Sequence, residues 1–311
     1  MSVAFIFPGQ GSQEVGMGKA LCEAYPEAKA VFDAADDALG EKLSRLCFEG
    51  PEDALKLTAN TQPAILTVSV AAHAVFSKRC ATAPAFAAGH SLGEYSALVA
   101  AGAMSLADAV RSVRARGTFM QDAVPAGVGA MAAVLGLGPE KVKELCAQAA
   151  EGEVVSPANF NEPAQTVIAG HAKAVERASE ALKAAGARRV VPLPVSAPFH
   201  CALMQPVVPR LDEVLSRVAF KAPSCPVVTN VEAKPNADAS RLKALLLQQV
   251  TGSVRWVESV QAMEQGGVKK VVELGPGKVL CGLVKRISKG IECVNVEDPA
   301  SLDKALAAIG G

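Results

Sequence analysis

The chain has 311 residues, of which 50% are hydrophobic and only 4% are aromatic. A chain of this length can bury a large core and is expected to form one or two domains. Its 31 basic residues balance its 31 acidic residues, so the net charge gives no reason to expect a nucleic acid partner. The scarcity of aromatic side chains also argues against base stacking.

The apolar stretches are too short for a signal peptide or a membrane span. The first, at 3–7, ends at Pro8, and the longest, at 64–76, is interrupted by threonine, serine and histidine. The eight cysteines are scattered and contain no C-x-x-C pair, so zinc and redox motifs find no support. We therefore expect reduced thiols, a cytoplasmic setting and no membrane association.

The first part of the chain has the pattern of an α/β protein. It predicts, in order, a buried strand at 3–7, a helical pattern from about Met17, two helices within 52–79 (the second starting near Thr61), a strand, tight turn and helix over 84–102, and a helix at 106–123.

The middle of the chain has a different order of predicted elements. It predicts a strand at 129–135, a helix at 139–150, strands at 154–159 and 165–169, a helix at 171–185 and a strand at 188–195. The order β-α-β-β-α-β is that of a ferredoxin-like unit. We therefore expect a small inserted subdomain at 127–196.

The larger pattern then resumes. The remainder predicts a helix at 201–217, a strand at 226–229, helices at 240–250 and 256–265, a strand at 269–273, a helix at 278–288 and a strand at 291–296. Strands that alternate with helices imply a mostly parallel sheet covered on both faces. The expected fold is α/β, with a large α/β-hydrolase-like catalytic domain formed by 1–126 and 197–311.

Residues 89–93 read GHSLG, a G-x-S-x-G motif between a predicted strand and a predicted helix. In that context the glycines make room for a strained turn that exposes the serine, and the helix points backbone N–H groups at the site. An ordinary glycine turn at the end of a strand is the alternative. The context favours Ser91 as a nucleophile.

A serine nucleophile needs a base, and the chain has four histidines. His73 lies in an apolar helical stretch, His171 starts a predicted helix, and the side chain of His90 should point away from the neighbouring Ser91. His200 follows a proline-containing loop where the chain returns to the larger domain. Position alone gives His200 about the same weight as the other three histidines together.

No acid is well placed to complete a hydrolase triad. Hydrolases with the chain order Ser, Asp or Glu, His need an acid between Ser91 and His200. The acids weighed there lie on predicted helices or in the small subdomain: Asp108, Asp122, Glu140, Glu144, Glu162 and Glu176. This argues against ordinary α/β-hydrolase chemistry and leaves a backbone or amide carbonyl to orient the histidine.

Seven segments together carry a resemblance to one enzyme family. They are FPGQGSQ (7–13), TQPAI (61–65), GHSLGEYSAL (89–98), RGTFMQ (116–121), PANFNEPAQTVIAG (157–170), PLPVSAPFHCALM (192–204) and ELGPGKVLCGL (273–283). With these motifs in order over nearly its full length, the chain resembles the malonyl-CoA:acyl carrier protein transacylases, the malonyl-loading enzymes of fatty-acid synthesis.

The resemblance implies a role for each matching residue. Ser91 would be the acylated nucleophile, His200 its general base and later its acid, and Gln249 the residue whose backbone carbonyl holds the histidine. Gln10 and Leu92 would supply the backbone N–H donors of an oxyanion hole. Losing one such donor typically costs about 3–4 kcal/mol of transition-state stabilisation.

The same resemblance implies four substrate-binding residues. Arg116 matches the arginine that pairs with the malonyl carboxylate, since a guanidinium group can bind a carboxylate through two parallel hydrogen bonds. Solvation or an ion pair is the alternative for a helix arginine. Met120 and Phe199 would wall the acyl pocket, unless they serve only in packing, and Gln62 of the TQPAI segment joins them.

Four basic residues are expected to contact the phosphates of coenzyme A and the acidic carrier protein. They are Arg188, Arg189, Lys285 and Arg286. Ordinary exposed charges are an equally weighted alternative for each of them.

Two local patterns suggest a phosphate-binding loop and a cysteine nucleophile, and neither interpretation fits the sequence. In ELGPGKV the first glycine of a phosphate-binding loop would fall on Val272. Cys201, beside His200, has no oxyanion turn of its own, so a cysteine nucleophile is disfavoured.

The expected function is malonyl transfer from malonyl-CoA to the phosphopantetheine thiol of acyl carrier protein, with ping-pong kinetics and a malonyl-serine intermediate. It implies no metal and no cofactor, and we expect a free-standing monomer. A thioesterase or esterase, a non-catalytic carrier-binding protein and an acyltransferase domain of a polyketide synthase are the alternatives. The missing triad acid and Arg116 favour transfer over hydrolysis, and the intact Ser91, His200 and Gln10 favour catalysis.

Overall fold

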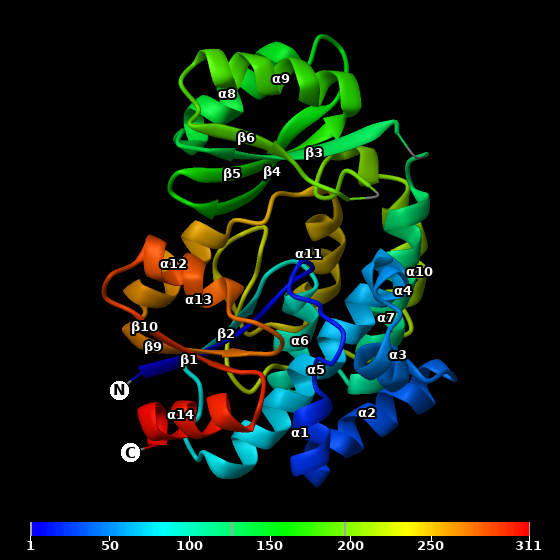
Figure 1. The fold of residues 1–311 in the computed structure, drawn as a ribbon, viewed down its shortest axis with the longest axis vertical. Helices are drawn as coiled ribbons and strands as arrows, with labels where there is room; N and C mark the ends of the chain where they lie inside the picture. The colour runs from blue at the N-terminus through cyan, green and yellow to red at the C-terminus, as the bar shows by residue number, and fades with distance from the viewer. Residues whose placement is uncertain (1, 126, 196, 311) are drawn as a thin grey trace.

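The computed structural model describes residues 2–125, 127–195 and 197–310. Within these ranges the chain forms a mixed α/β fold with one six-stranded sheet and one four-stranded sheet (Figure 1). The domain boundaries expected at 126/127 and 196/197 fall at residues outside the described ranges.

The larger sheet is mostly parallel, as expected. Its strands lie in the order β10 (Glu292–Val296), β9 (Val268–Leu274), β1 (Ser2–Phe7), β2 (Phe86–Gly89), β7 (Val227–Val228) and β8 (Pro235–Asn236). All neighbouring pairs run parallel except β7 and β8, which are antiparallel. The two-residue edge strand β8 was not predicted.

Both faces of this sheet are covered, because side chains alternate along each strand. On β1, Val3, Phe5 and Phe7 enter one hydrophobic core, whereas Ala4 and Ile6 enter another. The first core is closed by α2 (Pro26–Leu39), α5 (Thr58–Arg79), α6 (Gly93–Ala100) and α7 (Leu106–Asp122). The second is closed by α12 (Trp256–Gln265) and α13 (Val279–Ile287).

The remaining helices of the larger part are α1 (Lys19–Ala24), α3 (Leu43–Glu49), α4 (Glu52–Lys56), α10 (Val207–Leu215), α11 (Ala239–Thr251) and α14 (Pro299–Gly310). α5 begins before the expected Thr61, because Asn60 and Thr61 donate side-chain hydrogen bonds to the carbonyls of Ala54 and Leu55. The helix expected at 201–217 is instead a 3-10 turn, Ala202–Met204, followed by α10. Among the described helices, none combines the length and apolar character needed to cross a membrane.

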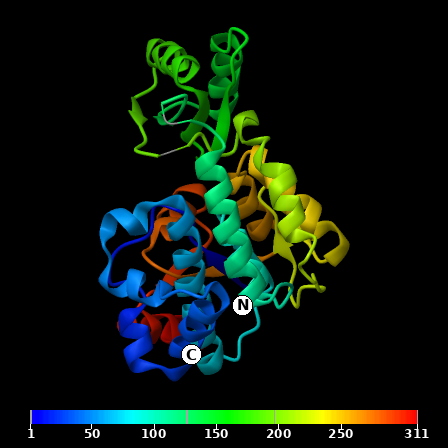
Figure 2. The same ribbon diagram turned by 90° about the vertical axis from the view of Figure 1, so that its right-hand side faces the viewer.

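The smaller sheet is antiparallel, with strands in the order β4 (Val155–Glu162), β5 (Gln165–His171), β3 (Gly129–Leu135) and β6 (Arg189–Pro192). With α8 (Pro139–Ala149) and α9 (Ala172–Ala184), the element order is the predicted β-α-β-β-α-β. The two helices pack on one face, at one end of the molecule (Figure 2). β6 ends at Pro192 rather than at 195.

One expectation about the cysteines is wrong. Cys281 of α13 and Cys293 of β10 form a disulfide, because α13 packs on the strand that follows it and brings the two Cα atoms to 5.4 Å. The other six cysteines are free thiols, as expected.

Candidate active site

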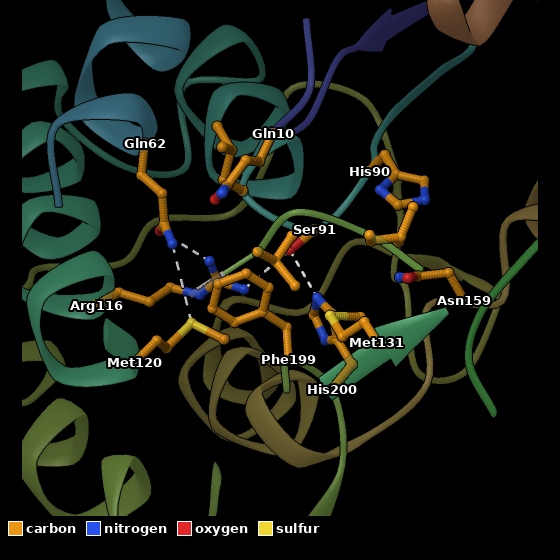
Figure 3. A pocket seen from close by; sticks show the side chains of 13 residues that line it. Gln10, Gln62, His90, Ser91, Arg116, Met120, Met131, Asn159, Phe199 and His200 are labelled. Atoms are coloured by element: carbon orange, nitrogen blue, oxygen red, sulfur yellow. Dashed lines mark hydrogen bonds between the residues drawn. The ribbon is translucent and has the colours of Figure 1, made fainter. Parts of the chain in front are cut away.

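The site lies at the carboxyl edge of the larger sheet. Gln10 follows β1, Ser91 follows β2 and Asn230 follows β7, three neighbouring parallel strands whose ends meet at one edge. This is where open α/β sheets usually bind ligands. The smaller sheet covers this edge, since Met131 of β3 and Asn159 of β4 line the same pocket (Figure 3).

The GHSLG segment forms a tight strand-to-helix turn with Ser91 in the left-handed region, at φ 53°. A Cβ at Gly89 would lie 1.9 Å from the backbone carbon of Gly93, and a Cβ at Gly93 would lie 2.2 Å from the Phe7 carbonyl oxygen. Both glycines are therefore required by close backbone approach. The strained serine turn that the motif predicts is confirmed.

Ser91, His200 and Gln249 form a hydrogen-bonded chain. The Ser91 hydroxyl lies 2.8 Å from Nε2 of His200 (Figure 3), and Nδ1 of the same ring lies 2.8 Å from the backbone carbonyl oxygen of Gln249. A carbonyl can only accept, so Nδ1 carries the proton and Nε2 is free to accept from the hydroxyl. A serine–histidine pair of this geometry can form an activated nucleophile.

The imidazole of His200 is held neutral. The ring is buried, and burial lowers its pKa to about 3, with the charge of Arg116 acting in the same direction. At neutral pH His200 is therefore in the uncharged form that a general base requires, with Nε2 toward the Ser91 hydroxyl, and its protonated form gives the proton back readily.

Arg116 of α7 is buried beside the nucleophile with only 1% of its surface exposed. Its Nη2 donates to Ser91 Oγ at 3.0 Å and to Gln249 Oε1 at 2.9 Å, and its Nη1 donates to Gln62 Oε1 at 2.8 Å. Among the described residues its Nε has no acceptor. A buried cation with only neutral direct partners is suited to an anionic ligand.

The backbone N–H groups of Gln10 and Leu92 have no protein acceptor among the described residues, and both residues line the same pocket as Ser91. Gly9 allows the first loop to approach, since a Cβ there would lie 2.5 Å from the His90 carbonyl oxygen. Unpaired N–H donors beside a serine suit an oxyanion.

The pocket around these groups has a volume of about 120 Å³. Its lining includes most of the predicted site residues: Gln10, Gln62, Ser91, Leu92, Arg116, Met120, Phe199 and His200. His90 and residues of the smaller sheet complete the lining. Gln62 also contacts Met120, at 3.9 Å between Nε2 and the sulfur. His90 turns toward Asn161, with 2.8 Å between Nε2 and Oδ1, and makes no hydrogen bond to Ser91, as predicted.

The four predicted basic residues do not line this pocket. Arg188 and Arg189 are exposed at β6, an edge strand of the smaller sheet. Arg286 donates to Glu162 of β4 at 3.0 Å, and Lys285 lines a separate cavity beside the disulfide.

A cluster with metal-like spacing lies at this disulfide, formed by Glu273, Cys281 and Cys293. The disulfide consumes both thiols, and the Glu273 carboxylate accepts from the backbone N–H groups of Leu280 and Cys281. The cluster therefore has no free donor set for a metal.

Sequence reasoning missed two residues of the site. Asn230 accepts from the Ser91 N–H at 2.7 Å and donates to the Gly89 carbonyl at 2.6 Å, so it holds both ends of the nucleophile turn. Glu94, in the first turn of α6, accepts from Asn230 and Gln249. Asn230 lies just after a strand at the carboxyl edge of the sheet, and Glu94 lies inside a motif already quoted, so position could have indicated both.

The acyl transferase domain family matches residues 4–300. The malonyl CoA-acyl carrier protein transacylase of Escherichia coli K12 is 50% identical over 303 residues, covering 97% of this chain and 98% of the relative. That of Bacillus subtilis is 49% identical, covering 99% of this chain and 97% of the relative.

Solved structures agree with these relatives. An acyl carrier protein S-malonyltransferase from Vibrio cholerae superposes with a TM-score of 0.96 at 50% identity, covering 98% of this chain and all of that one. A malonyl-transacylase solved with a type II polyketide synthase acyl carrier protein gives 0.96 at 47% identity, covering 99% of this chain and all of that one. The fold, the site and these matches define an acyltransferase. The chain belongs to the malonyl CoA-acyl carrier protein transacylase family.

Proposed function

We propose that this enzyme transfers a malonyl group from malonyl-CoA to the phosphopantetheine thiol of an acyl carrier protein, through a malonyl-serine intermediate, and so supplies fatty-acid chain extension. The names of the relatives support the substrate and the partner. The observation that carries the mechanism is the chain from Ser91 to His200 and the Gln249 carbonyl, with Arg116 touching the serine oxygen.

In the first half-reaction His200 accepts the proton of the Ser91 hydroxyl as the oxygen attacks the thioester carbonyl. The negative charge that forms on the carbonyl oxygen is stabilised by the N–H groups of Gln10 and Leu92. The histidinium then returns the proton to the sulfur of coenzyme A as the carbon–sulfur bond breaks. This leaves a malonyl ester on Ser91 and a free coenzyme thiol.

The second half-reaction runs the same steps in reverse order with another thiol. His200 accepts the proton of the carrier thiol, the sulfur attacks the ester, and the proton returns to Ser91 Oγ. One base and one oxyanion hole therefore serve both directions, which gives ping-pong kinetics.

Arg116 is proposed to select the malonyl group by binding its free carboxylate. Gln62 and Gln249 present only neutral oxygens to the guanidinium, so an incoming carboxylate would be its only direct anionic partner. Phe199 and Met120 would limit the width of the acyl group. Phe199→Ser should then improve the use of branched methylmalonyl-CoA, and no gain would count against that role.

We also propose a more specific description of the two parts of the fold. The larger part, 1–126 and 197–311, is described as α/β-hydrolase-like and the inserted part, 127–196, as ferredoxin-like, supported by the serine turn and the β-α-β-β-α-β order. We also propose a cytoplasmic monomer that needs no metal or cofactor, with Arg188, Arg189, Lys285 and Arg286 contacting coenzyme phosphates or the carrier.

The test is an assay of malonyl transfer from malonyl-CoA to a phosphopantetheinylated carrier, with Ser91→Ala as the control. Intact-mass measurement after malonyl-CoA alone should show one malonyl adduct that persists until a thiol is added. Rapid hydrolysis of the adduct would indicate a thioesterase instead. A covalent adduct on Ser91→Ala would transfer the nucleophile role to Cys201.

A further inference from the structure

We propose that Glu94 is a positioning residue of the acyl transfer, whose carboxylate holds the Asn230 backbone and the Gln249 side-chain amide, the two residues that bond the Ser91 turn and, through Gln249, Arg116. This inference rests on the proposed function. It gives a role to Glu94, a buried carboxylate that the proposed mechanism does not use.

Glu94 lies in the first turn of α6, three residues after the nucleophile, and is only 2% exposed. A single carboxylate oxygen, Oε2, accepts from the backbone N–H of Asn230 at 3.0 Å and from the side-chain Nε2 of Gln249 at 2.8 Å. The carboxylate thus joins α6 to the end of β7 and to α11.

The two residues held by Glu94 in turn hold the nucleophile. The Asn230 amide bonds the Ser91 N–H and the Gly89 carbonyl, and the Gln249 Nε2 donates to the Ser91 carbonyl at 3.0 Å. The backbone of Ser91 is therefore fixed on both sides. A left-handed serine is a strained conformation that persists only where its surroundings over-determine it.

Glu94 and the Ser91 carbonyl together set which way the Gln249 amide faces, because both accept from its Nε2. An ionised carboxylate can only accept, so it demands the NH₂ end of the amide and leaves Oε1 toward Arg116, which donates to it at 2.9 Å. A reversed amide would set an oxygen against the carboxylate and an NH₂ group against the guanidinium. The relay from Glu94 through Gln249 therefore supplies one of the acceptors that orient Arg116, beside Gln62.

The charged state of Glu94 is secondary to this geometry. Burial raises its pKa to about 7, while its bonds to Asn230 and Gln249 and the positive charge of Arg116 act in the opposite direction. Tyr95 on the same helix is another titratable group that interacts with it, and burial favours the neutral form of the tyrosine. Oε2 can accept in either state, because a protonated carboxyl keeps an acceptor oxygen.

The chain offers a matched control in Glu273 of β9. It is equally buried, and its carboxylate also accepts two hydrogen bonds, from the N–H groups of Leu280 at 3.0 Å and Cys281 at 2.7 Å. Both of these bonds come from the start of α13, and Glu273 is not among the residues that line the site pocket. Removing Glu273 should therefore reproduce the structural cost of losing a buried carboxylate without the positioning effect.

The experiment measures the single-turnover rate of Ser91 acylation by malonyl-CoA, per titrated active site, for wild type, Glu94→Ala, Glu94→Gln and Glu273→Ala. The loss of these two hydrogen bonds predicts a fall of roughly 10–100-fold for Glu94→Ala. Glu94→Gln, whose amide oxygen can still accept both bonds, should stay within about fivefold of wild type. Glu273→Ala should lower the melting temperature but stay within about twofold in rate.

A second readout keeps this inference separate from the malonyl assignment. Labelling of Ser91 by a fluorophosphonate probe, which reports serine reactivity without malonyl-CoA, should slow in the same order of variants. If the wild-type enzyme reacts with the probe but not with malonyl-CoA, the proposed function is refuted. The labelling rates of the Glu94 variants would still test the positioning role. An unchanged rate per active site in Glu94→Ala would overturn the positioning role. If that variant does not fold, Glu94→Asp, one methylene too short to reach both amides, replaces it.

Discussion

Arg116 and Ser91 are in direct contact, with the guanidinium Nη2 donating to the serine Oγ at 3.0 Å. In a malonyl ester only one methylene separates the carbonyl from the free carboxylate. A guanidinium that touches the serine oxygen is therefore within reach of the carboxylate once the ester has formed.

Arg116→Ala should abolish the preference for malonyl-CoA over acetyl-CoA. A buried charge-assisted pair is worth about 2–3 kcal/mol, so we expect kcat/KM for malonyl-CoA to fall by roughly 30–150-fold, with little change for acetyl-CoA. Arg114→Ala is the control, since that arginine lies on the same helix and pairs with Glu41. Survival of the malonyl preference in Arg116→Ala would show that another group binds the carboxylate.

His200→Ala should slow acylation more than Gln249→Ala does, although both residues belong to one chain of hydrogen bonds. Loss of the general base is expected to slow acylation by about 100–10,000-fold. Gln249→Ala keeps the backbone carbonyl that bonds His200 and loses only the contacts of its amide, so it should cost roughly 10–100-fold. Single-turnover acylation measures both, and equal losses would place the essential group in the glutamine side chain.

Gly89→Ala should destabilise the fold by more than about 3 kcal/mol, because the added Cβ would lie 1.9 Å from a backbone carbon. Gly138→Ala is the matched control. It has φ −70° and no atom within 4 Å of an added Cβ, so its effect should stay within about 1 kcal/mol. Urea denaturation gives both free energies of unfolding, and similar values would contradict the close packing of the nucleophile turn.

Glu273→Gln should change how stability depends on pH. Burial raises the pKa of Glu273 to about 7, above its unfolded value, so the unfolded chain loses this proton first as the pH rises. The stability of wild type relative to Glu273→Gln should therefore fall between about pH 4.5 and 7, on the order of 3 kcal/mol in total. Chemical denaturation of the two proteins over this range measures the difference, and a constant difference would exclude a raised pKa.

Charge reversal at Lys285 and Arg286 should raise the KM for the carrier protein and change its dependence on salt, because both side chains are exposed on α13 and acyl carrier proteins are usually acidic. Lys304→Glu, an exposed site on α14, is the control for the change in net charge made by each single reversal, Lys285→Glu or Arg286→Glu. An unchanged KM would remove the pair from the docking surface.

The sequence predicted the elements best where the signal was local. The β-α-β-β-α-β unit and the strands β1, β2 and β9 follow from apolar runs bounded by glycine and proline. The family resemblance then predicted residues that meet in the structure although they lie far apart in the chain: Gln10, Ser91, Arg116 and His200 in the quoted segments, and Gln249 outside them.

What the sequence could not predict depends on contacts across the fold. The roles of Asn230 and Glu94 exist only because β7, α6 and α11 converge at one point. The disulfide between Cys281 and Cys293 likewise needs α13 packed on β10, and spacing alone does not distinguish it from two free thiols. Two-residue strands such as β8 carry too few residues for any periodicity.

The histidine of this site takes its partner from the main chain, at the carbonyl of Gln249. Every amino acid brings the same carbonyl, so no point substitution that keeps α11 in place can delete this acceptor. In a triad that ends in an aspartate, one base change can remove the third member. Here the group that orients the histidine depends only on where the backbone of α11 runs. The glutamine side chain is therefore available for a second task, accepting a hydrogen bond from Arg116.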